Sequence, residues 1–155
     1  MIGLAKVAPG EGHVEVAERP ERSPDAGEVA LDVHAVGICG TDLHIWLGEY
    51  PSVPPVTMGH EVCGVVAELG EGVDPSWAGA RVAVETFFST CGECPYCRAG
   101  KLSVCEQRRS IGTHVDGGFA PRLVLPARNL HRVPEALPDE AAALSEPLAC
   151  VCNSL

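Results

Sequence analysis

The amino-acid sequence predicts a mainly β fold, and three observations lead to this prediction. The chain has 17 glycines and 13 prolines among its 155 residues, a share that is high but below the range of disordered proteins. These residues fall between short apolar stretches, as in strands that are joined by turns. Only two segments have helical character, so helices are expected to be a minority of the fold.

Four stretches are expected to form strands. Residues 29–38 alternate in a half-regular way between apolar and polar, and residues 62–67 form a continuous apolar run of buried-strand length. Residues 81–85 and 119–125 have the same character. Turns and bulges between or within the strands are expected at glycines 37, 64, 70, 72, 79, 117 and 118.

The two helical segments are residues 41–47 and a longer one from Asp139 to the C-terminus. The second segment opens with Pro138, Asp139 and Glu140, and acidic side chains are favourable near the positive end of the helix dipole. We expect one helix over residues 139–155.

Length, charge and hydropathy narrow the class of protein. A chain of 155 residues supports one hydrophobic core, so a single domain over 1–155 is expected. The formal net charge of −10 argues against a nucleic-acid partner, since phosphates would be repelled. No apolar run approaches the roughly 18 residues of a membrane span, and residues 1–6 do not form a signal peptide. We therefore expect a cytoplasmic protein with no membrane partner and with reduced cysteines.

Four cysteines lie within 15 residues, in the pattern C-x2-C-x2-C-x7-C, and they are listed here in order: Cys91, Cys94, Cys97 and Cys105. This spacing lets a short loop place four thiolates around one tetrahedral ion. Zinc is the favoured ion because it accepts four sulfurs at about 2.3 Å and requires no redox partner. The sequence thus predicts a structural zinc lobe at about residues 88–110.

An iron–sulfur cluster and a pair of disulfides are the other interpretations of these cysteines. The two-cluster ferredoxin pattern ends in C-x3-C-P, whereas here the last gap is seven residues and Glu106 follows Cys105. Two disulfides would require an oxidising compartment, which nothing in the chain suggests. Both interpretations rank below zinc.

A second set of possible ligands lies upstream. Cys39 follows an apolar strand and a glycine, and His60 and Glu61 follow Gly59. On a regular strand, adjacent side chains point to opposite faces. His60 and Glu61 can therefore bind the same ion only if the backbone turns at Gly59. Otherwise one of them would contact a ligand of the ion rather than the ion itself. Three protein ligands would leave a catalytic zinc with an open position. Taken alone, Cys39 and His60 are more often a core thiol and a hydrogen-bonded histidine than a metal pair, and Glu61 is more often a solvated acid at a strand end.

With these motifs in place, the chain resembles the catalytic domain of the zinc-dependent medium-chain dehydrogenases. The resemblance runs from near residue 1 to residue 155 and rests on five segments in order, which are residues 37–44, 59–61, 91–105, 117–120 and 146–148. It implies a GroES-like (chaperonin-10-like), partly open β-barrel with a structural zinc lobe. The C-terminal helix would link this barrel to a Rossmann domain, whose Gly-x-Gly-x-x-Gly motif the chain lacks.

The resemblance also implies roles for single residues. Cys39 and His60 would bind a catalytic zinc, and the four-cysteine loop a structural one. In the polyol and threonine dehydrogenase branch, glutamates at the positions of Glu61 and Glu146 bind zinc or its water, which favours polyols, sugars or hydroxy-amino acids as substrates. Cys150, four residues after Glu146, would share its helix face if the helix continues through Pro147, although a small buried residue is the simpler interpretation.

The implied reaction is hydride transfer between a secondary alcohol and NAD or NADP. By resemblance, Thr41 takes the alcohol proton and His44 passes it to solvent. Asp42 would orient His60, or it would simply cap the helix that follows Cys39. The isolated chain is expected to be inactive because it lacks a cofactor domain, and the longer enzyme is expected to be a homo-oligomer.

Two alternatives remain at this point. The chain could be a zinc-stapled β-barrel interaction module without catalysis. A zinc-free quinone reductase relative fits poorly, because such proteins lack both ligand sets.

Overall fold

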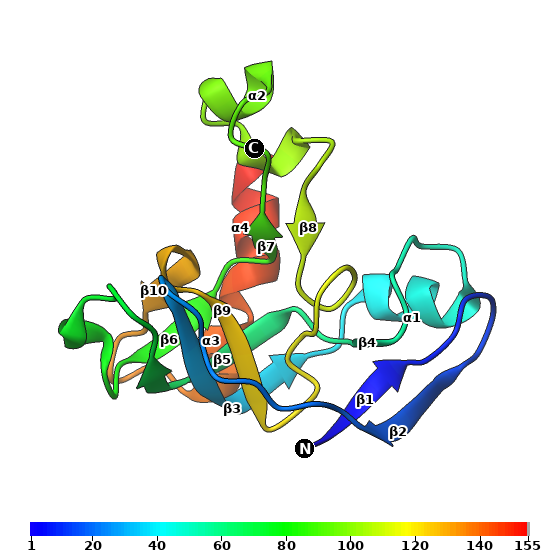
Figure 1. Ribbon diagram of the computed structural model, residues 1–155, viewed down its shortest axis with the longest axis horizontal. Helices are drawn as coiled ribbons and strands as arrows, with labels where there is room; N and C mark the ends of the chain where they lie inside the picture. The colour runs from blue at the N-terminus through cyan, green and yellow to red at the C-terminus, as the bar shows by residue number, and fades with distance from the viewer. Residues whose placement is uncertain (155) are drawn as a thin grey trace.

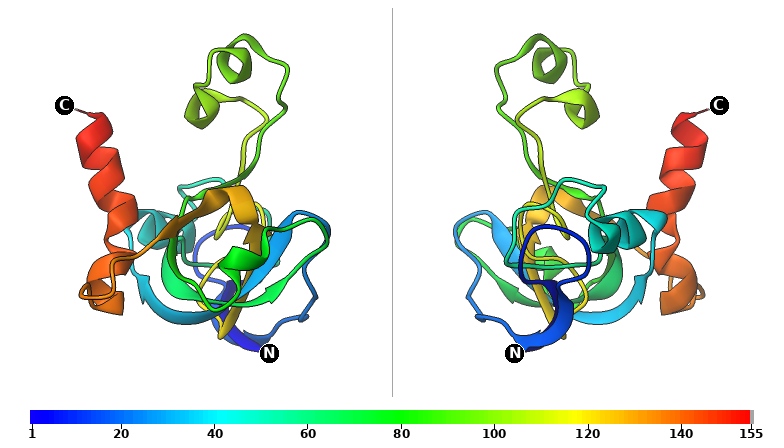
Figure 2. Two further views of the ribbon diagram at one scale, coloured as in Figure 1. Left: turned by 90° about the vertical axis from the view of Figure 1, so that its left-hand side faces the viewer. Right: turned by 90° about the vertical axis from the view of Figure 1, so that its right-hand side faces the viewer.

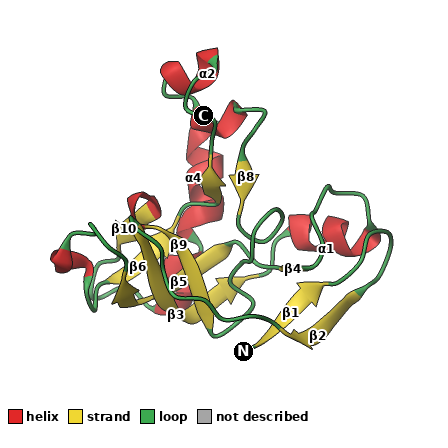
Figure 3. Ribbon diagram, in the orientation of Figure 1, coloured by secondary structure: helices red, strands yellow, loops and turns green. Residues whose placement is uncertain are grey.

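The largest sheet of the protein contains five antiparallel strands in the order β10-β6-β5-β3-β9 (Figures 1 and 3). It belongs to a computed structural model that describes residues 1–154. The strands are β3 (Glu28–Gly37), β5 (Glu61–Leu69), β6 (Arg81–Val84), β9 (Arg122–Pro126) and β10 (Leu130–Arg132).

Two smaller sheets complete the β structure. A three-stranded sheet in the order β2-β1-β4 contains β1 (Ile2–Lys6), β2 (Val14–Glu18) and β4 (Val56–Thr57). A two-stranded ribbon pairs β7 (Phe87–Ser89) with β8 (Arg109–Ser110). Both larger sheets keep free edges, so the barrel is partly open, as expected.

The helices are short and lie outside the sheets. They are α1 (Gly40–Leu47), α2 (Pro95–Arg98), α3 (Asp139–Ala143) and α4 (Ser145–Asn153), and 3-10 turns cover Pro75–Trp77, Leu102–Val104 and Ala127–Asn129. Among residues 1–154, no helix combines the length and the apolar composition that crossing a bilayer requires.

The side chains of the large sheet form most of the hydrophobic core. Its buried members are mostly β-branched or leucine side chains, including Val29, Leu31, Val62, Leu123 and Leu125. Burying each such side chain contributes about 1.5–3 kcal/mol relative to leaving it in water. This explains why the segments 29–38 and 62–67 were predictable, since an apolar strand run reports directly on burial.

Two of the expected elements differ from the structure. The strand expected at 119–125 begins only at Arg122, because Pro121 has no N–H with which to continue the ladder. The helix expected over 139–155 is interrupted at Leu144, and residue 155 lies outside the described residues. In one continuous helix the ring of Pro147 would clash with the carbonyl of Ala143, so a new helix starts and places Pro147 in its first turn.

Contacts of Asp139 hold α3 against the sheet. Its Oδ2 lies 3.0 Å from Nδ1 of His34, on β3, and its Oδ1 lies 3.6 Å from Sγ of Cys63, on β5. Burial raises the pKa of Cys63 to about 11, so this thiol stays protonated at neutral pH. The start of α4, and with it Glu146, is therefore fixed relative to the barrel.

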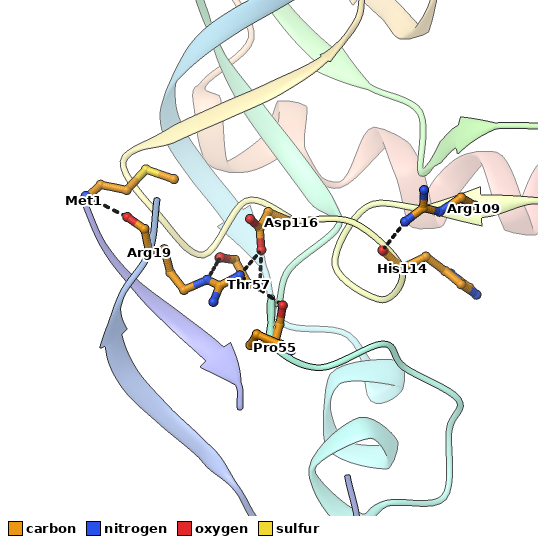
Figure 4. Close-up of polar contacts among 7 residues, drawn as sticks. All are labelled: Met1, Arg19, Pro55, Thr57, Arg109, His114 and Asp116. Carbon is orange, nitrogen blue, oxygen red and sulfur yellow. Dashed lines mark hydrogen bonds and ion pairs between the residues drawn. The ribbon is translucent and has the colours of Figure 1, made fainter. Parts of the chain in front are cut away.

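A polar network joins the small sheet to the loop after β8 (Figure 4). Arg19 donates to Oδ1 of Asp116 over 3.0 Å and to the carbonyl of Pro55 over 3.0 Å. The same Asp116 oxygen accepts the backbone N–H of Thr57 over 2.7 Å. The network fixes the segment that leads from β4 to His60.

Figure 2 shows how the outer elements leave the barrel. Helix α4 and the β7–β8 ribbon extend from the barrel on one side, and they diverge from each other. The ribbon carries α2 and the four-cysteine loop at its end, as Figure 1 also shows. The expected lobe, residues 88–110, is thus an excursion whose two ends are joined by β7 and β8.

Candidate metal centre

The four cysteines of the lobe place their sulfur atoms within 4.8 Å of one another. The Sγ of Cys91 lies 3.8 Å from that of Cys97 and 3.6 Å from that of Cys105. A tetrahedral ion with bonds of about 2.3 Å separates its sulfur ligands by about 3.8 Å. All eight cysteines are free thiols, so the spacing arises without a disulfide.

Backbone N–H groups point at these sulfurs. The N–H of Cys94 donates to Sγ of Cys91 over 3.3 Å, and the N–H of Cys97 donates to Sγ of Cys94 over 3.4 Å. Hydrogen bonds from the backbone of Glu93 and of Cys94 lower the pKa of Cys91 to about 7. Burial raises the pKa of Cys97 to about 11, so the backbone donors favour the thiolate, the form that binds zinc, at Cys91 and not at every cysteine of the loop.

A second group of possible ligands forms where two strands end. Cys39 lies between β3 and α1, His60 precedes β5, and Glu61 is the first residue of β5. One ligand atom from each residue lies within 4.8 Å of the others. His60 and Glu61 are 6% and 5% exposed, whereas Cys39 is only partly buried, so the group is covered on the side of β5 and less covered at the cysteine.

The backbone turns at Gly59, which was the condition for His60 and Glu61 to reach one ion. Gly59 has φ of 88°, a conformation that favours glycine. The ring of Phe119 lies 2.8 Å from where a Cβ of residue 59 would stand. Gly59 is thus required twice, for the turn and for the close packing of Phe119.

Gly37 makes room for the carboxylate of Glu61. The two residues are partners in the β3–β5 ladder, and a Cβ at residue 37 would overlap the Oε2 of Glu61. The sequence had suggested a turn or bulge at this glycine. Instead its missing side chain leaves the space that the buried carboxylate occupies.

Asp42 caps α1 and also faces His60. Its Oδ2 accepts the backbone N–H of Cys39 over 2.9 Å, which caps α1. Its Oδ1 faces Nδ1 of His60 at 3.9 Å, and both of these buried atoms lack a hydrogen-bond partner within residues 1–154. If Nδ1 carries the proton toward Asp42, the lone pair is on Nε2, where it can bind a metal.

Thr41 and His44 lie on α1 at different depths. Oγ1 of Thr41 is 3.6 Å from Sγ of Cys39, so the hydroxyl lies beside the three-residue group. The side chain of His44 is 58% exposed, and its Nδ1 pairs with Oε2 of Glu49 at 2.7 Å. The structure therefore places the first residue at the site and the second at its solvent side.

Glu146 is not part of the group formed by Cys39, His60 and Glu61. It lies on α4, where its Oε1 accepts a hydrogen bond from Oγ1 of Thr86 and lies 3.9 Å from Sγ of Cys150. The shared face of Glu146 and Cys150 was expected if the helix continued through Pro147. Sequence reasoning missed Thr86, because a threonine at the end of a strand carries no signal of a contact 60 residues away.

The charges around Cys150 connect α4 to the three-residue group. The carboxylate of Glu146, burial and the charge of Cys39 raise the pKa of Cys150, and the charge of Glu61 adds to them. The exposed thiol of Cys150 contradicts the expectation that it is a small buried residue.

A cavity of about 590 Å³ lies beside Glu146. Its wall combines the end of β6, the lobe, β10 and α4, and its polar members include Thr86, Ser103, Arg108, Glu146 and Asn153. This volume is in the range of small-molecule sites. The fold thus presents two metal-binding geometries and a ligand-sized cavity.

Comparison with known proteins identifies the family of this fold. Residues 25–135 match the model of the alcohol dehydrogenase GroES-like domain, so the chain belongs to this family. It is 41% identical over its whole length to a sorbitol dehydrogenase of Halalkalibacterium halodurans, covering 45% of that protein. It is 39% identical over its whole length to a D-arabitol-phosphate dehydrogenase of Enterococcus avium, covering 44% of it.

A solved structure has the same fold. A zinc-binding dehydrogenase from Sinorhizobium meliloti, bound to NADP, matches with a TM-score of 0.90 and 38% identity, over 97% of this chain and 43% of that one. The chain therefore spans under half the length of the relatives it matches. The expected family and GroES-like fold are confirmed.

Proposed function

We propose that the chain is the catalytic domain, residues 1–155, of a zinc-dependent NAD- or NADP-linked dehydrogenase that oxidises a secondary alcohol to a ketone. The observation that carries this proposal is the convergence of Cys39, His60 and Glu61, whose ligand atoms lie within 4.8 Å of one another in a partly buried site. Three protein ligands are the number that leaves a catalytic zinc with an open position. An interaction module would gain nothing from such a site.

In this proposal the residues of the chain hold two zinc ions. Cys39, His60 and Glu61 bind the catalytic ion, with Glu146 as a further ligand to it or to its water, and the four-cysteine loop binds the structural ion. A bound zinc supplies a Lewis acid that lowers the pKa of a neighbouring alcohol hydroxyl. Asp42 holds the tautomer of His60 that leaves Nε2 free to bind the metal.

The chain also provides a route for the proton of the alcohol. Thr41 lies beside Cys39, where its hydroxyl can accept that proton as it donates its own. His44 is exposed and paired with Glu49, so it can exchange a proton with solvent. A nicotinamide cofactor, when bound, would supply the hydride acceptor.

Substrate class, location and assembly follow from the same proposal. The substrates are polyols, sugars or hydroxy-amino acids, in keeping with the sorbitol and arabitol-phosphate relatives. The enzyme is cytoplasmic, because its metal site depends on reduced thiols. The full-length enzyme is a homo-oligomer, and the 155-residue chain alone does not turn over alcohol.

Native mass spectrometry of the purified chain tests the metal sites. Two zinc ions per chain are expected. Cys39→Ser should keep only the structural ion, and Cys94→Ser should keep only the catalytic ion. Cys152→Ser, which changes an exposed thiol, is the matched control and should keep both. A single zinc that is lost only in Cys94→Ser would contradict the proposed catalytic site. NADH formation from sorbitol by the isolated chain would contradict its inactivity.

A further inference from the structure

We propose that Arg108 recognises an anionic group, a phosphate or a carboxylate, on the alcohol substrate, which binds in the 590 Å³ cavity between α4 and the lobe. This inference rests on the function proposed above and names its substrate class. It concerns Arg108, a residue of the lobe that belongs to neither set of candidate metal ligands.

The cavity joins the lobe to the candidate catalytic residue Glu146. Ser103 and Arg108 line it from the lobe, and Glu146 and Asn153 line it from α4. The lining does not include Cys39, His60 or Glu61, so a ligand in this cavity meets the proposed catalytic site at Glu146. The serine hydroxyl and the asparagine amide are neutral donors that suit an oxyanion or the hydroxyls of a polyol.

Arg108 is the cation of this cavity whose hydrogen-bonding capacity is least used. Its guanidinium makes one hydrogen bond within residues 1–154, from Nη1 to the carbonyl of Ser103 over 3.2 Å, and no ion pair in that part of the chain. A guanidinium has five N–H donors and binds phosphate or carboxylate through two of them. Arg108 is half-buried, which strengthens such a contact relative to one in open water.

The other basic side chains of the cavity are already engaged. Nε2 of His131 pairs with Oε1 of Glu85 at 2.7 Å. Arg132 stacks on the ring of Trp77, 4.6 Å from its centroid, and donates to the carbonyl of Ser76 over 2.7 Å. An anionic ligand would therefore be attracted to the Arg108 end of the cavity.

The charges of the cavity also orient the ligand. The carboxylate of Glu146 repels an anion, whereas it accepts a hydrogen bond from a hydroxyl. An alcohol that carries a phosphate or carboxylate consequently binds with its anionic group at Arg108 and its hydroxyls toward Glu146. One relative is named for a phosphorylated polyol, D-arabitol phosphate, which has both groups.

Arg108 has a competing structural role, because a zinc with four thiolates is negative and Arg108 lies close to Cys105. Its backbone N–H donates to the carbonyl of Cys105 over 3.0 Å. If charge compensation were its function, loss of the guanidinium would release zinc from the lobe. The metal content of an Arg108 variant distinguishes the two roles.

The test is calorimetric titration of the zinc-loaded chain with sorbitol, sorbitol 6-phosphate and gluconate, with zinc counted by native mass spectrometry. Either the phosphate or the carboxylate ligand should bind at least tenfold more tightly than sorbitol, and the better one identifies the anion. Arg108→Gln should lose roughly ten- to hundredfold of that affinity, since a charge-assisted hydrogen bond is removed. Arg109→Gln, whose guanidinium donates to the carbonyl of His114, is the matched control and should bind as the wild type does.

Arg108→Lys keeps the charge but not the two-pronged geometry, so it should retain both zincs and bind severalfold more weakly than the wild type. Equal binding of the anionic ligands by wild type and Arg108→Gln would overturn the inference. It would also be overturned if Arg108→Gln lost the zinc of the lobe and Arg108→Lys restored both the zinc and the ligand affinity. ADP-ribose that competes with sorbitol 6-phosphate would assign Arg108 to the cofactor instead and would also overturn it. If the wild-type chain holds two zinc ions and the anionic ligand binds equally well without Arg108, only this inference is refuted. If the wild-type chain holds a single zinc ion, the proposed function is refuted.

Discussion

Thr86 donates a hydrogen bond from its Oγ1 to Oε1 of Glu146 and so connects the end of β6 to α4. The two residues are far apart in the chain, and the contact fixes where the carboxylate points. Partners that orient a metal ligand are worth as much as tenfold to a hundredfold in metal affinity. Thr86 is therefore a positioning residue for Glu146 in the proposed catalytic site.

Replacing Thr86 by valine should weaken zinc binding at the catalytic site by about ten- to hundredfold, because Glu146 loses the donor that holds it. The affinity is measured by competition with a chromophoric chelator. Thr86→Ser keeps the hydroxyl and should bind zinc as the wild type does. Equal affinities for Thr86→Val and the wild type would show that Glu146 needs no such support.

Asp42 is expected to separate helix capping from metal binding. Asp42→Asn keeps an oxygen for the backbone N–H of Cys39, so stability should change little, while the lost charge toward His60 should reduce zinc affinity about ten- to hundredfold. Asp42→Ala loses both contacts and should also cost about 0.5–2 kcal/mol of unfolding free energy. Urea unfolding and zinc competition on the same samples measure the two effects. Unchanged zinc affinity in Asp42→Asn would leave capping as the only role.

Local sequence patterns predicted the parts of the fold and site that depend on local spacing. The strands that contain Val29 and Val62 were predictable because their apolar runs become the core. The four-cysteine group was predictable because one short loop supplies all its sulfurs. The sequence also suggested a pairing of Cys39 with His60, but only the turn at Gly59 brings the pair together.

Features that depend on distant contacts could not be read from the sequence. Strand β1 leaves Ile2 exposed and buries Lys6, so its burial does not follow the hydropathy of its sequence. Lys6 is 1% exposed because its Nζ donates to the carbonyls of Gly10 and Gly12. Strand β2 did carry a usable signal, the alternation of Val14 and Val16 with acidic residues.

Removal of zinc should unfold the lobe and leave the barrel intact. The core cluster is built from residues outside 90–110, whereas α2 and the cysteine loop would depend mainly on the bound metal. After chelation, trypsin should cut rapidly after Arg98 and Lys101, while the barrel fragments remain associated. Mass spectrometry of the digest locates the cuts. Early cleavage throughout the barrel would show that the lobe and the barrel unfold together.

His114 should make stability fall as the pH drops below about 6.5. Burial, assisted by the charges of Arg109 and Arg108, lowers the pKa of His114 in the folded protein. The unfolded chain then binds more protons between the folded pKa and about 6.5, so the stabilisation is present above that window and is lost as the pH falls through it. His114→Asn retains an acceptor for the hydroxyl of Thr113, 2.8 Å from Nδ1, but cannot titrate. Urea midpoints from pH 8 to 5 should decline more steeply in the wild type than in this variant, and parallel curves would rule out the effect.

Comparison of Gly37 with Gly64 separates site geometry from stability. In Gly37→Ala the new Cβ overlaps the carboxylate of Glu61 and lies 3.1 Å from its Cβ, so this buried side chain is displaced and the unfolding free energy should fall by about 1–3 kcal/mol. The displaced carboxylate should also weaken zinc at the catalytic site at least tenfold, as seen by chelator competition. Gly64→Ala is the matched control within the same pair of strands, because its Cβ meets the backbone carbonyl of Asp32, which cannot yield. This control should lose about 1–3 kcal/mol while the folded fraction keeps its zinc affinity. If Gly37→Ala bound zinc normally, Glu61 would be a structural carboxylate rather than a ligand.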